Sequence, residues 1–258
     1  MATSTNPAGR RARLAGNLFV RAFLAAWSAY SSVVDSYVLP GPWEVAHRLW
    51  QMFGDVYEAK HVLYSFAHII AAVIISFVIG SALAFLAHYF TVSAHAIHGR
   101  ISPFLNSFSG IGWTFLAIIW FGISDVTVVF VISMVLIPFA IINMREGLDN
   151  LEAERLEMAA SFSRSGWRRF RLVILPSLLP FIFATIRSSF GVAWKVALTA
   201  ELFGGNTGLG YLLNLARQDF DMPLVLGVII IIVAFVYSID RLIFTPIQAH
   251  LARHHAAA

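Results

Sequence analysis

The sequence contains several apolar runs, each long enough to cross a lipid bilayer. A membrane-spanning helix needs about 20 consecutive and mostly apolar residues, whereas barrel strands show short segments of alternating polarity. Only helices and closed barrels satisfy their backbone hydrogen bonds in lipid, so the long runs predict an all-α membrane protein with about six transmembrane helices. The runs lie near residues 14–34, 62–90, 104–122, 126–144, 177–202 and 224–246.

The composition agrees with a lipid environment. Of the 258 residues, 59% are hydrophobic and only 12% are charged, against about 25% charged in a typical soluble domain. The net charge is +4, but the basic residues lie mostly between the apolar runs. That distribution is typical of membrane proteins, and no nucleic acid partner is expected. The chain has no cysteine, which excludes disulfides, thiolate metal sites and cysteine nucleophiles.

The distribution of Lys and Arg predicts the orientation of the chain. If the N-terminus lies inside, most of the 18 basic residues fall in inside segments or at inner span ends. Only Arg48, Lys60 and Arg217 fall in outside segments, and Arg187 and Lys195 lie within a span. Because cytoplasmic loops carry the excess of positive charge, both termini are expected in the cytoplasm. The expected organisation is a tail at 1–13, a single transmembrane domain at 14–250 and a second tail at 251–258.

The outside segment after the first run is expected to form a short helix on the membrane surface. Pro40-Gly41-Pro42 is a turn signal that precedes it. The apolar face of this helix would carry Trp43, Leu49, Trp50 and Phe53.

The long inside loop, residues 145–176, has the pattern of a short amphipathic helix outside the lipid, at 151–163. Leu151, Leu156 and the Ala159-Ala160 pair recur at helical spacing in its polar first half. A short surface helix between two spans can dock into a groove of a partner protein. The alternative is an ordinary cytoplasmic connector whose alanines simply favour helix formation.

In the same loop, Glu157-Met158-Ala159-Ala160 is followed by Ile174-Leu175-Pro176. This pattern and its spacing resemble the EAA loop of bacterial ABC importer permeases. The segments VLPGPWEVAHRLWQMF, AIIWFGIS and GVAWKVALTAELFGG resemble the nitrate/sulfonate/taurine branch of that family. The resemblance therefore extends over residues 37–250. The chain departs from the family pattern at Met158, where alanine is usual.

The resemblance implies a specific role for the loop. Its short helix would insert into a groove on a separate ATPase subunit and transmit the opening and closing of that subunit to the spans. Ala159 and Ala160 would permit close approach, and Glu157 would pair with a basic or amide group of the ATPase. Ser163 stands where the family has its loop glycine, so Gly166 would take over the turn.

The resemblance also implies a type I ABC importer permease fold in a bacterial inner membrane. The implied partners are two ATPase subunits, a second permease copy or homologue, and a periplasmic solute-binding protein. A phosphate-binding P-loop needs Gly-x-x-x-x-Gly-Lys-Ser/Thr, and neither Lys60 nor Lys195 follows a glycine. ATP and Mg would therefore be bound by the partner subunit. No catalytic residue, cofactor or metal is expected in this chain, since its nine histidines form no metal-binding or nucleophile motif.

Lys195 is the candidate for a residue that contacts the cargo. Arg187 and Glu201 fall near opposite membrane faces and are expected to reach water by snorkelling, whereas Lys195 lies nearer the midplane. Intramembrane charge is expensive and usually faces a partner or a cavity. Lys195 would line the path and attract a small anion such as a sulfonate, nitrate or carboxylate. Alternatively, it would pair with a carboxylate or carbonyl of another span, or pack at a dimer interface.

Trp194, Ser109 and Trp113 complete the candidate path residues. Trp194 shares a helical line with Arg187. Ser109 lies among small residues, which favour close packing of helices in lipid over a place in the path. Trp113 likewise suits packing or the membrane interface better than the path.

Two rival functions are weighed against the ABC permease. An ion-gradient-driven secondary transporter would need acidic or histidine relays at mid-membrane. The span interiors offer only Lys195 and His68, and His68 is expected to be a hydrogen-bonded structural group. A membrane-embedded enzyme would need a convergent set of His, Asp or Ser side chains, which the spans lack. Beyond the small-anion class that Lys195 suggests, the sequence does not identify the particular cargo.

Overall fold

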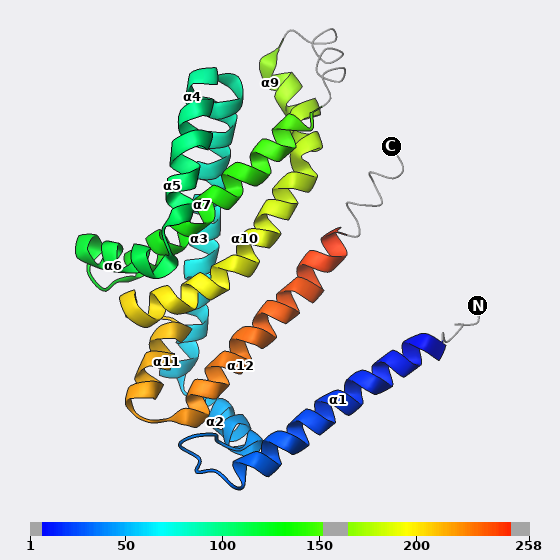
Figure 1. Cartoon of the computed structure of the whole chain (residues 1–258), viewed down its shortest axis with the longest axis vertical. Helices are drawn as coiled ribbons and strands as arrows, with labels where there is room; N and C mark the ends of the chain where they lie inside the picture. Colours follow the sequence, from blue (N-terminus) through cyan, green and yellow to red (C-terminus); the bar gives the residue numbers. More distant parts are fainter. Residues whose placement is uncertain (1–6, 152–164, 249–258) are drawn as a thin grey trace. The chain divides into compact units, whose positions relative to one another are not determined.

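The computed structural model describes residues 7–151 and 165–248, and every regular element in these ranges is a helix (Figure 1). Four of the expected coupling residues, Glu157, Ala159, Ala160 and Ser163, lie outside the described residues. The α-helices are α1 (Pro7–Ser31), α2 (Pro42–Gly54), α3 (Val56–Tyr89), α4 (Thr91–Ala96), α5 (Ser102–Ser107), α6 (Gly110–Phe121), α7 (Asp125–Asp149), α9 (Gly166–Arg169), α10 (Leu175–Gly204), α11 (Leu209–Gln218) and α12 (Met222–Ile239). Three π-helical segments extend them at Ile97–Ile101, Phe170–Ile174 and Asp240–Phe244.

Four helical stretches in the described ranges are long and apolar enough to cross a membrane, which confirms the expected all-α membrane fold. They are Val56–Tyr89, Asp125–Asp149, Gly166–Gly204 and Met222–Gln248. A fifth crossing results if the two arms of a bent pair are counted together. At 1.5 Å per residue, the 34 residues of α3 extend over about 51 Å, against about 30 Å of hydrocarbon. This helix therefore tilts in the bilayer or projects from it.

The bent pair corrects the continuous span expected at 104–122. Val92–Ser107 and Gly110–Phe121 meet at an angle of 88°. Ser109 has an extended backbone at the break, and its hydroxyl accepts a hydrogen bond from the Gly112 amide at 3.2 Å. A serine that caps α6 in this way starts a new helix, because its side chain satisfies an amide that the first turn leaves without a partner.

The first expected span, 14–34, is also corrected. The structure has a helix there, α1, but α1 is not among the helices that are apolar enough to cross a membrane. Its sequence explains the difference, because Asn17, Arg21 and several serines interrupt the apolar run at 14–34, whereas Arg10, Arg11 and Arg13 precede it. Charged residues of this kind raise the cost of burial in hydrocarbon. Within residues 7–151 and 165–248, the count of about six spans therefore becomes four, or five with the bent pair.

The chain divides into two compact units, which are described separately here. The first comprises residues 1–59 and 213–231, and the second comprises residues 60–212 and 232–258.

In the first unit, α2 packs against the start of α12. A Cβ atom on Gly227 would lie 2.6 Å from Leu49 Cδ2, so glycine at this position makes room for the leucine. Leu49 therefore belongs to the packed face of α2, which corrects its expected place on the membrane-surface face. Trp43 and Trp50 lie on the other face and are each 81% exposed.

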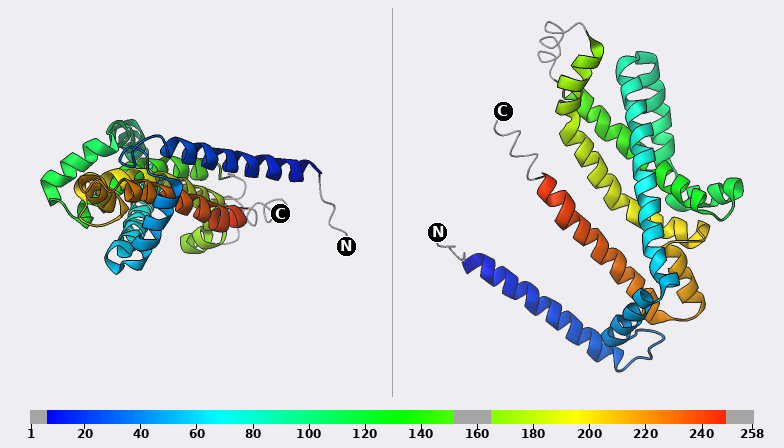
Figure 2. Two further views of the ribbon diagram at one scale, coloured as in Figure 1. Left: turned by 90° about the horizontal axis from the view of Figure 1, so that it is seen from below. Right: turned by 180° about the vertical axis from the view of Figure 1, so that it is seen from behind.

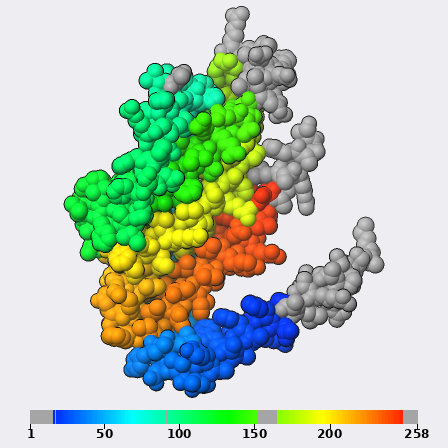
Figure 3. All heavy atoms as spheres, viewed as in Figure 1, coloured from blue at the N-terminus to red at the C-terminus, as the bar shows by residue number. Residues whose placement is uncertain are grey.

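In the second unit, α7 has the largest buried share of the apolar helices, and α10 and α6 pack against it. Figure 1 and the reverse view in Figure 2 both show α7 and α10 side by side, and in Figure 3 their green and yellow surfaces adjoin. Gly80 brings α3 close to α7. A Cβ atom on Gly80 would lie 2.5 Å from Ala140 Cβ and 3.0 Å from the Ile137 carbonyl oxygen.

Candidate functional site

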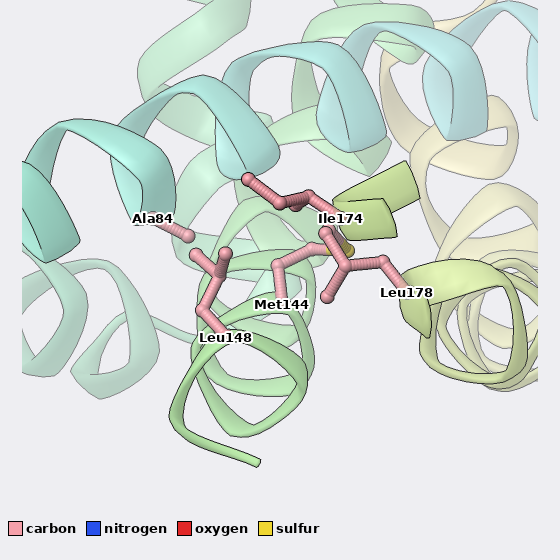
Figure 4. Close-up of a cluster of buried hydrophobic side chains, with 5 residues drawn as sticks. All are labelled: Ala84, Met144, Leu148, Ile174 and Leu178. Atoms are coloured by element: carbon pink, nitrogen blue, oxygen red, sulfur yellow. The ribbon is translucent and has the colours of Figure 1, made fainter. Parts of the chain in front are cut away.

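Both flanks of the expected coupling segment are anchored in one apolar cluster. Met144 and Leu148 come from the end of α7, Ile174 and Leu178 come from the start of α10 and the π-helical turn before it, and Ala84 comes from α3 (Figure 4). All five side chains are buried, and Leu151 and Phe170 pack against them. Because protein cores are close-packed, a displacement of the segment between α7 and α9 would be passed to three long helices.

The contact between the two flanks depends on Gly147. A Cβ atom there would lie 2.8 Å from Phe181 Cγ and 3.0 Å from Leu178 Cδ2, so a larger residue forces α7 and α10 apart. Gly166, the expected turn residue, is the first residue of α9. The Ser165 hydroxyl accepts a hydrogen bond from the Arg168 amide at 3.5 Å and caps this short helix.

Two of the candidate path residues, Lys195 and Ser109, are exposed on neighbouring segments. A Cβ atom on Gly110 would lie 3.7 Å from Val196 Cγ1, which places the start of α6 against this part of α10. Within the described ranges, the Lys195 ammonium has no hydrogen-bond or ion-pair partner. An ammonium on an apolar helix that has no partner among the described residues is available to a partner from elsewhere.

The other two candidates, Trp194 and Trp113, are buried among aromatic rings, at 3% and 5% exposure. The Trp194 ring stands edge-on to Phe66, with centroids 5.2 Å apart, and lies parallel to Phe235 at 6.4 Å. The Trp113 ring lies 5.2 Å from Phe108. Within the described structure, neither indole Nε1 has a hydrogen-bond partner. In the single chain, both tryptophans therefore serve helix packing.

A buried polar site centred on Glu201 was not expected from the sequence. The carboxylate is 1% exposed and accepts hydrogen bonds from Ser65 Oγ at 2.8 Å, from the Gly210 amide at 2.9 Å and from His68 Nδ1 at 2.9 Å. The expectation that Glu201 reaches water was wrong, because α3 and the start of α11 supply donors in place of water. His68 is hydrogen-bonded, as expected.

The same site reaches the start of α7. His68 Nε2 lies 3.4 Å from Asp125 Oδ1, and the Thr207 hydroxyl donates a hydrogen bond to the same carboxylate. The Gly208 amide donates to His61 Nδ1 at 3.1 Å. The connection between α10 and α11 is thereby tied to both α3 and α7.

The sequence did contain a signal for this site. Glu201 stands in an apolar run, and the glycine-rich stretch GGNTGLG begins three residues later at Gly204. A carboxylate in such a place needs donors, and glycine-rich turns offer backbone amides. Ser65 and His68, three residues apart, share one helix face. In the described residues, no group of three or more His, Asp or Glu is arranged to hold a metal ion.

These features define a polytopic helical membrane protein. Its sequence has the pattern of a cytoplasmic coupling loop, and the helices that flank this loop in sequence pack into an apolar bundle. Residues 61–253 match the family model described as the binding-protein-dependent transport system inner membrane component. The chain belongs to this family, so the expected resemblance is confirmed. It is an ABC importer permease of the inner membrane, a transport subunit and not a catalytic one.

Curated relatives include permeases of different systems. The chain is 34% identical to the putative aliphatic sulfonates transport permease SsuC of Escherichia coli K12 over 116 residues, which are 45% of this chain and 44% of that protein. It is 25% identical to the taurine transport system permease TauC of the same strain over 220 residues, which are 81% of this chain and 77% of that protein. It is 27% identical to the riboflavin transport system permease RibX of Chloroflexus aurantiacus over 193 residues, which are 74% and 70% of the two chains.

The fold also has a solved counterpart. A chain of the MetNI methionine ABC transporter in an inward-facing conformation superposes with a TM-score of 0.65 at 16% identity, over 75% of this chain and 95% of that one. The expected type I importer fold is thus confirmed.

Proposed function

We propose that this permease forms the solute path of an importer for a small anion and is driven by a separate ATPase that grips residues 151–163. In this proposal both termini lie in the cytoplasm, as the distribution of basic residues predicts. ATP and Mg are held by the ATPase, and Glu157, Ala159, Ala160, Ser163 and Gly166 form or flank the surface that it contacts.

The apolar cluster at the flanks of the coupling segment is the observation that carries the coupling role. Leu148 and Ile174 lie on opposite sides of the segment in sequence and share one buried cluster with Ala84 of α3. A segment anchored in this way transmits force to the bundle, whereas a loose connector would absorb it. The family to which the chain belongs works with a binding protein, which agrees with an energised importer.

The anionic cargo is supported by Lys195 and by two relatives. SsuC and TauC are named for aliphatic sulfonates and for taurine, and a sulfonate carries a negative charge at neutral pH. Lys195 is exposed on α10 and has no partner in the described chain. In lipid or in a path of low dielectric, an ammonium attracts an anion far more strongly than it would in bulk water. Ser109, on the neighbouring segment, offers a hydroxyl to the same path.

The proposed assembly contains two copies of this permease, or one copy and a homologue, with two ATPase subunits and a periplasmic solute-binding protein. The fold supports this composition, because its solved counterpart comes from a structure named as an ABC transporter. A central path between two permeases would give the exposed Lys195 a place in the path wall.

The coupling role is tested by capture of the partner ATPase subunit by the permease, together with the stimulation of its ATP hydrolysis. Glu157→Lys and deletion of residues 151–163 should each abolish capture and cargo-stimulated ATP hydrolysis. Glu146→Lys is the matched control, since Glu146 is an exposed acidic residue of α7 outside the segment, and it should leave both intact. Full-speed uptake without ATP would instead identify a secondary transporter and overturn the proposal.

A further inference from the structure

The buried Glu201 carboxylate is surrounded by hydrogen-bond donors of its own chain. Three donors converge on its two oxygens, the Ser65 hydroxyl, the Gly210 amide and His68 Nδ1, all at 2.8–2.9 Å. An ionised carboxylate is an acceptor-only group with about four acceptor positions. The ionised form therefore satisfies all three donors, whereas an amide of the same size has a single acceptor oxygen.

Ser65 extends this arrangement into the connection between α10 and α11. Its Oγ accepts a hydrogen bond from the Leu209 amide at 2.7 Å, so its own proton is free for the carboxylate. One turn earlier on α3, His61 Nδ1 accepts a hydrogen bond from the Gly208 amide at 3.1 Å. The three successive amides of residues 208–210 thus all donate hydrogen bonds, two of them to side chains of α3 and one to the Glu201 carboxylate.

Glycines let the backbone close around this carboxylate. A Cβ atom on Gly208 would lie 2.2 Å from Glu201 Cδ, and one on Gly210 would lie 2.7 Å from Glu201 Cβ. A Cβ atom on Gly205 would lie 2.9 Å from Glu201 Cα. Gly208 also has a φ of +100°, a conformation that side chains disfavour. The connection is therefore shaped to the glutamate and not merely adjacent to it.

We propose that Glu201 is a positioning residue whose carboxylate orders the 205–210 connection and docks the start of α11 on α3. Asp125 also contacts this connection, because its carboxylate accepts a hydrogen bond from the Thr207 hydroxyl and lies beside His68. Loss of the carboxylate frees the connection locally and leaves the rest of the helical bundle packed. This role requires neither the anionic cargo nor the ATPase contact proposed above.

The absence of cysteine makes the proposal directly testable by thiol labelling. Two single-cysteine reporters are made in the full-length chain: Leu209→Cys in the connection and Leu178→Cys in the cluster of Figure 4, each at a position that is 1% exposed. Each reporter is combined with Glu201→Gln, and with Glu146→Gln as an exposed-carboxylate control. The rate of maleimide labelling is measured on the purified protein in nanodiscs.

Glu201→Gln should accelerate labelling at position 209 at least about tenfold, because labelling of a buried thiol reports local opening. The rate at position 178 should stay unchanged, and Glu146→Gln should alter neither rate. An unchanged rate at 209 would overturn the proposal. So would a parallel rise at 178, since that pattern means general loosening of the bundle.

Ser65→Ala keeps the proposal falsifiable if Glu201→Gln does not accumulate in the membrane. It removes the acceptor of the Leu209 amide and one donor to the carboxylate, and it leaves the charge in place. Labelling at 209 should rise by a smaller factor than with Glu201→Gln, again without a change at 178. Equal rates in Ser65→Ala and the native background would count against the role of the carboxylate.

Discussion

Arg187 of α10 forms a two-point ion pair with Asp240, which follows α12. Arg187 Nε donates to Asp240 Oδ1 at 2.9 Å and Nη2 donates to Oδ2 at 3.2 Å, while Nη1 donates to Gln248. The sequence suggested that Arg187 reaches water by snorkelling, but the structure gives it a partner in its own chain. The planar guanidinium matches a carboxylate in this geometry, which a lysine does not.

This pair should stabilise the contact between α10 and the end of α12. Arg187→Ala and Asp240→Ala should each lower the thermal unfolding temperature. The double variant should lose less free energy of unfolding than the two single variants lose together. The coupling free energy should be about 1 kcal/mol, because both partners are partly exposed and intramembrane polar contacts are modest. Arg241→Ala, at the exposed neighbouring position, should change little. Strict additivity in the cycle would show that the pair contributes nothing.

Arg48 holds three elements of the first unit together. Its Nη1 and Nη2 donate to the two Glu58 oxygens at 2.8 and 2.7 Å, and its Nε donates to Asp221 Oδ2 at 2.6 Å. The hydrogen bonds to Glu58 are the largest cause of a raised pKa of Arg48, opposed by its partial burial and reinforced by Asp221. Asp221 also caps α12, accepting the Leu224 amide at 3.1 Å.

Arg48→Lys should therefore destabilise the chain although the charge is kept, since an ammonium cannot make the fork-shaped contact. The expected loss is about 1.5–3 kcal/mol, the range for hydrogen bonds to charged groups. A group with a raised pKa stabilises the fold at every pH below its unfolded pKa, which for arginine lies well above the physiological range. The loss on substitution should hence be equal at about pH 6 and pH 9. Thermal unfolding of both proteins at the two pH values checks this expectation. A loss of stability at only one pH would contradict the stabilising role of the Arg48 ion pair.

Close approach of α3 and α7 at Gly80 gives a steric prediction. Gly80→Ala should reduce stability by about 1–3 kcal/mol, because the added methyl group meets Ala140 Cβ and the Ile137 carbonyl oxygen in a packed core. Gly99→Ala is the matched control, since a Cβ atom at Gly99 has no neighbour within 4 Å. Thermal unfolding of both variants separates the steric effect from the general gain that alanine brings to a helix. A similar shift in both would show that the two helices can part without cost.

The sequence predicted those parts of the fold that depend on local hydropathy. The apolar runs that became α3, α7, α10 and α12 were all found, because a span of about 20 apolar residues has few alternatives in lipid. The break between α5 and α6 was missed. A hydropathy window averages over Phe108 and Ser109, whereas the break results from one side-chain cap at Ser109. The expected span at α1 was wrong for a related reason, because a segment can form a helix without being apolar enough to cross a membrane.

The polar core at Glu201 shows a different limit of sequence reasoning. Helical spacing placed Glu201 correctly near one end of α10. A carboxylate at that position needs either water or hydrogen-bond donors from the protein. The choice between them is made by Ser65 and Gly210, which are brought to the carboxylate by tertiary packing. No local pattern encodes that meeting. His68 was assigned correctly because a buried imidazole is almost always hydrogen-bonded, whichever partner it finds.

Lys195 provides the prediction that bears most directly on the cargo. Lys195→Ala should raise the KM for anion uptake by the assembled transporter at least about tenfold, because a hydrogen bond to a charged group contributes about 1.5–3 kcal/mol. Lys195→Arg keeps the charge and should retain most of the uptake. Thr199→Ala, one turn further along α10, is the matched control, since that hydroxyl donates only to its own helix at the Lys195 carbonyl oxygen. Uptake of an aliphatic sulfonate without an amino group, of nitrate and of an aromatic carboxylate should be compared across the three variants. Equal uptake by Lys195→Ala and the native permease for every anion transported would remove Lys195 from the path and leave the ammonium to a dimer or lipid contact.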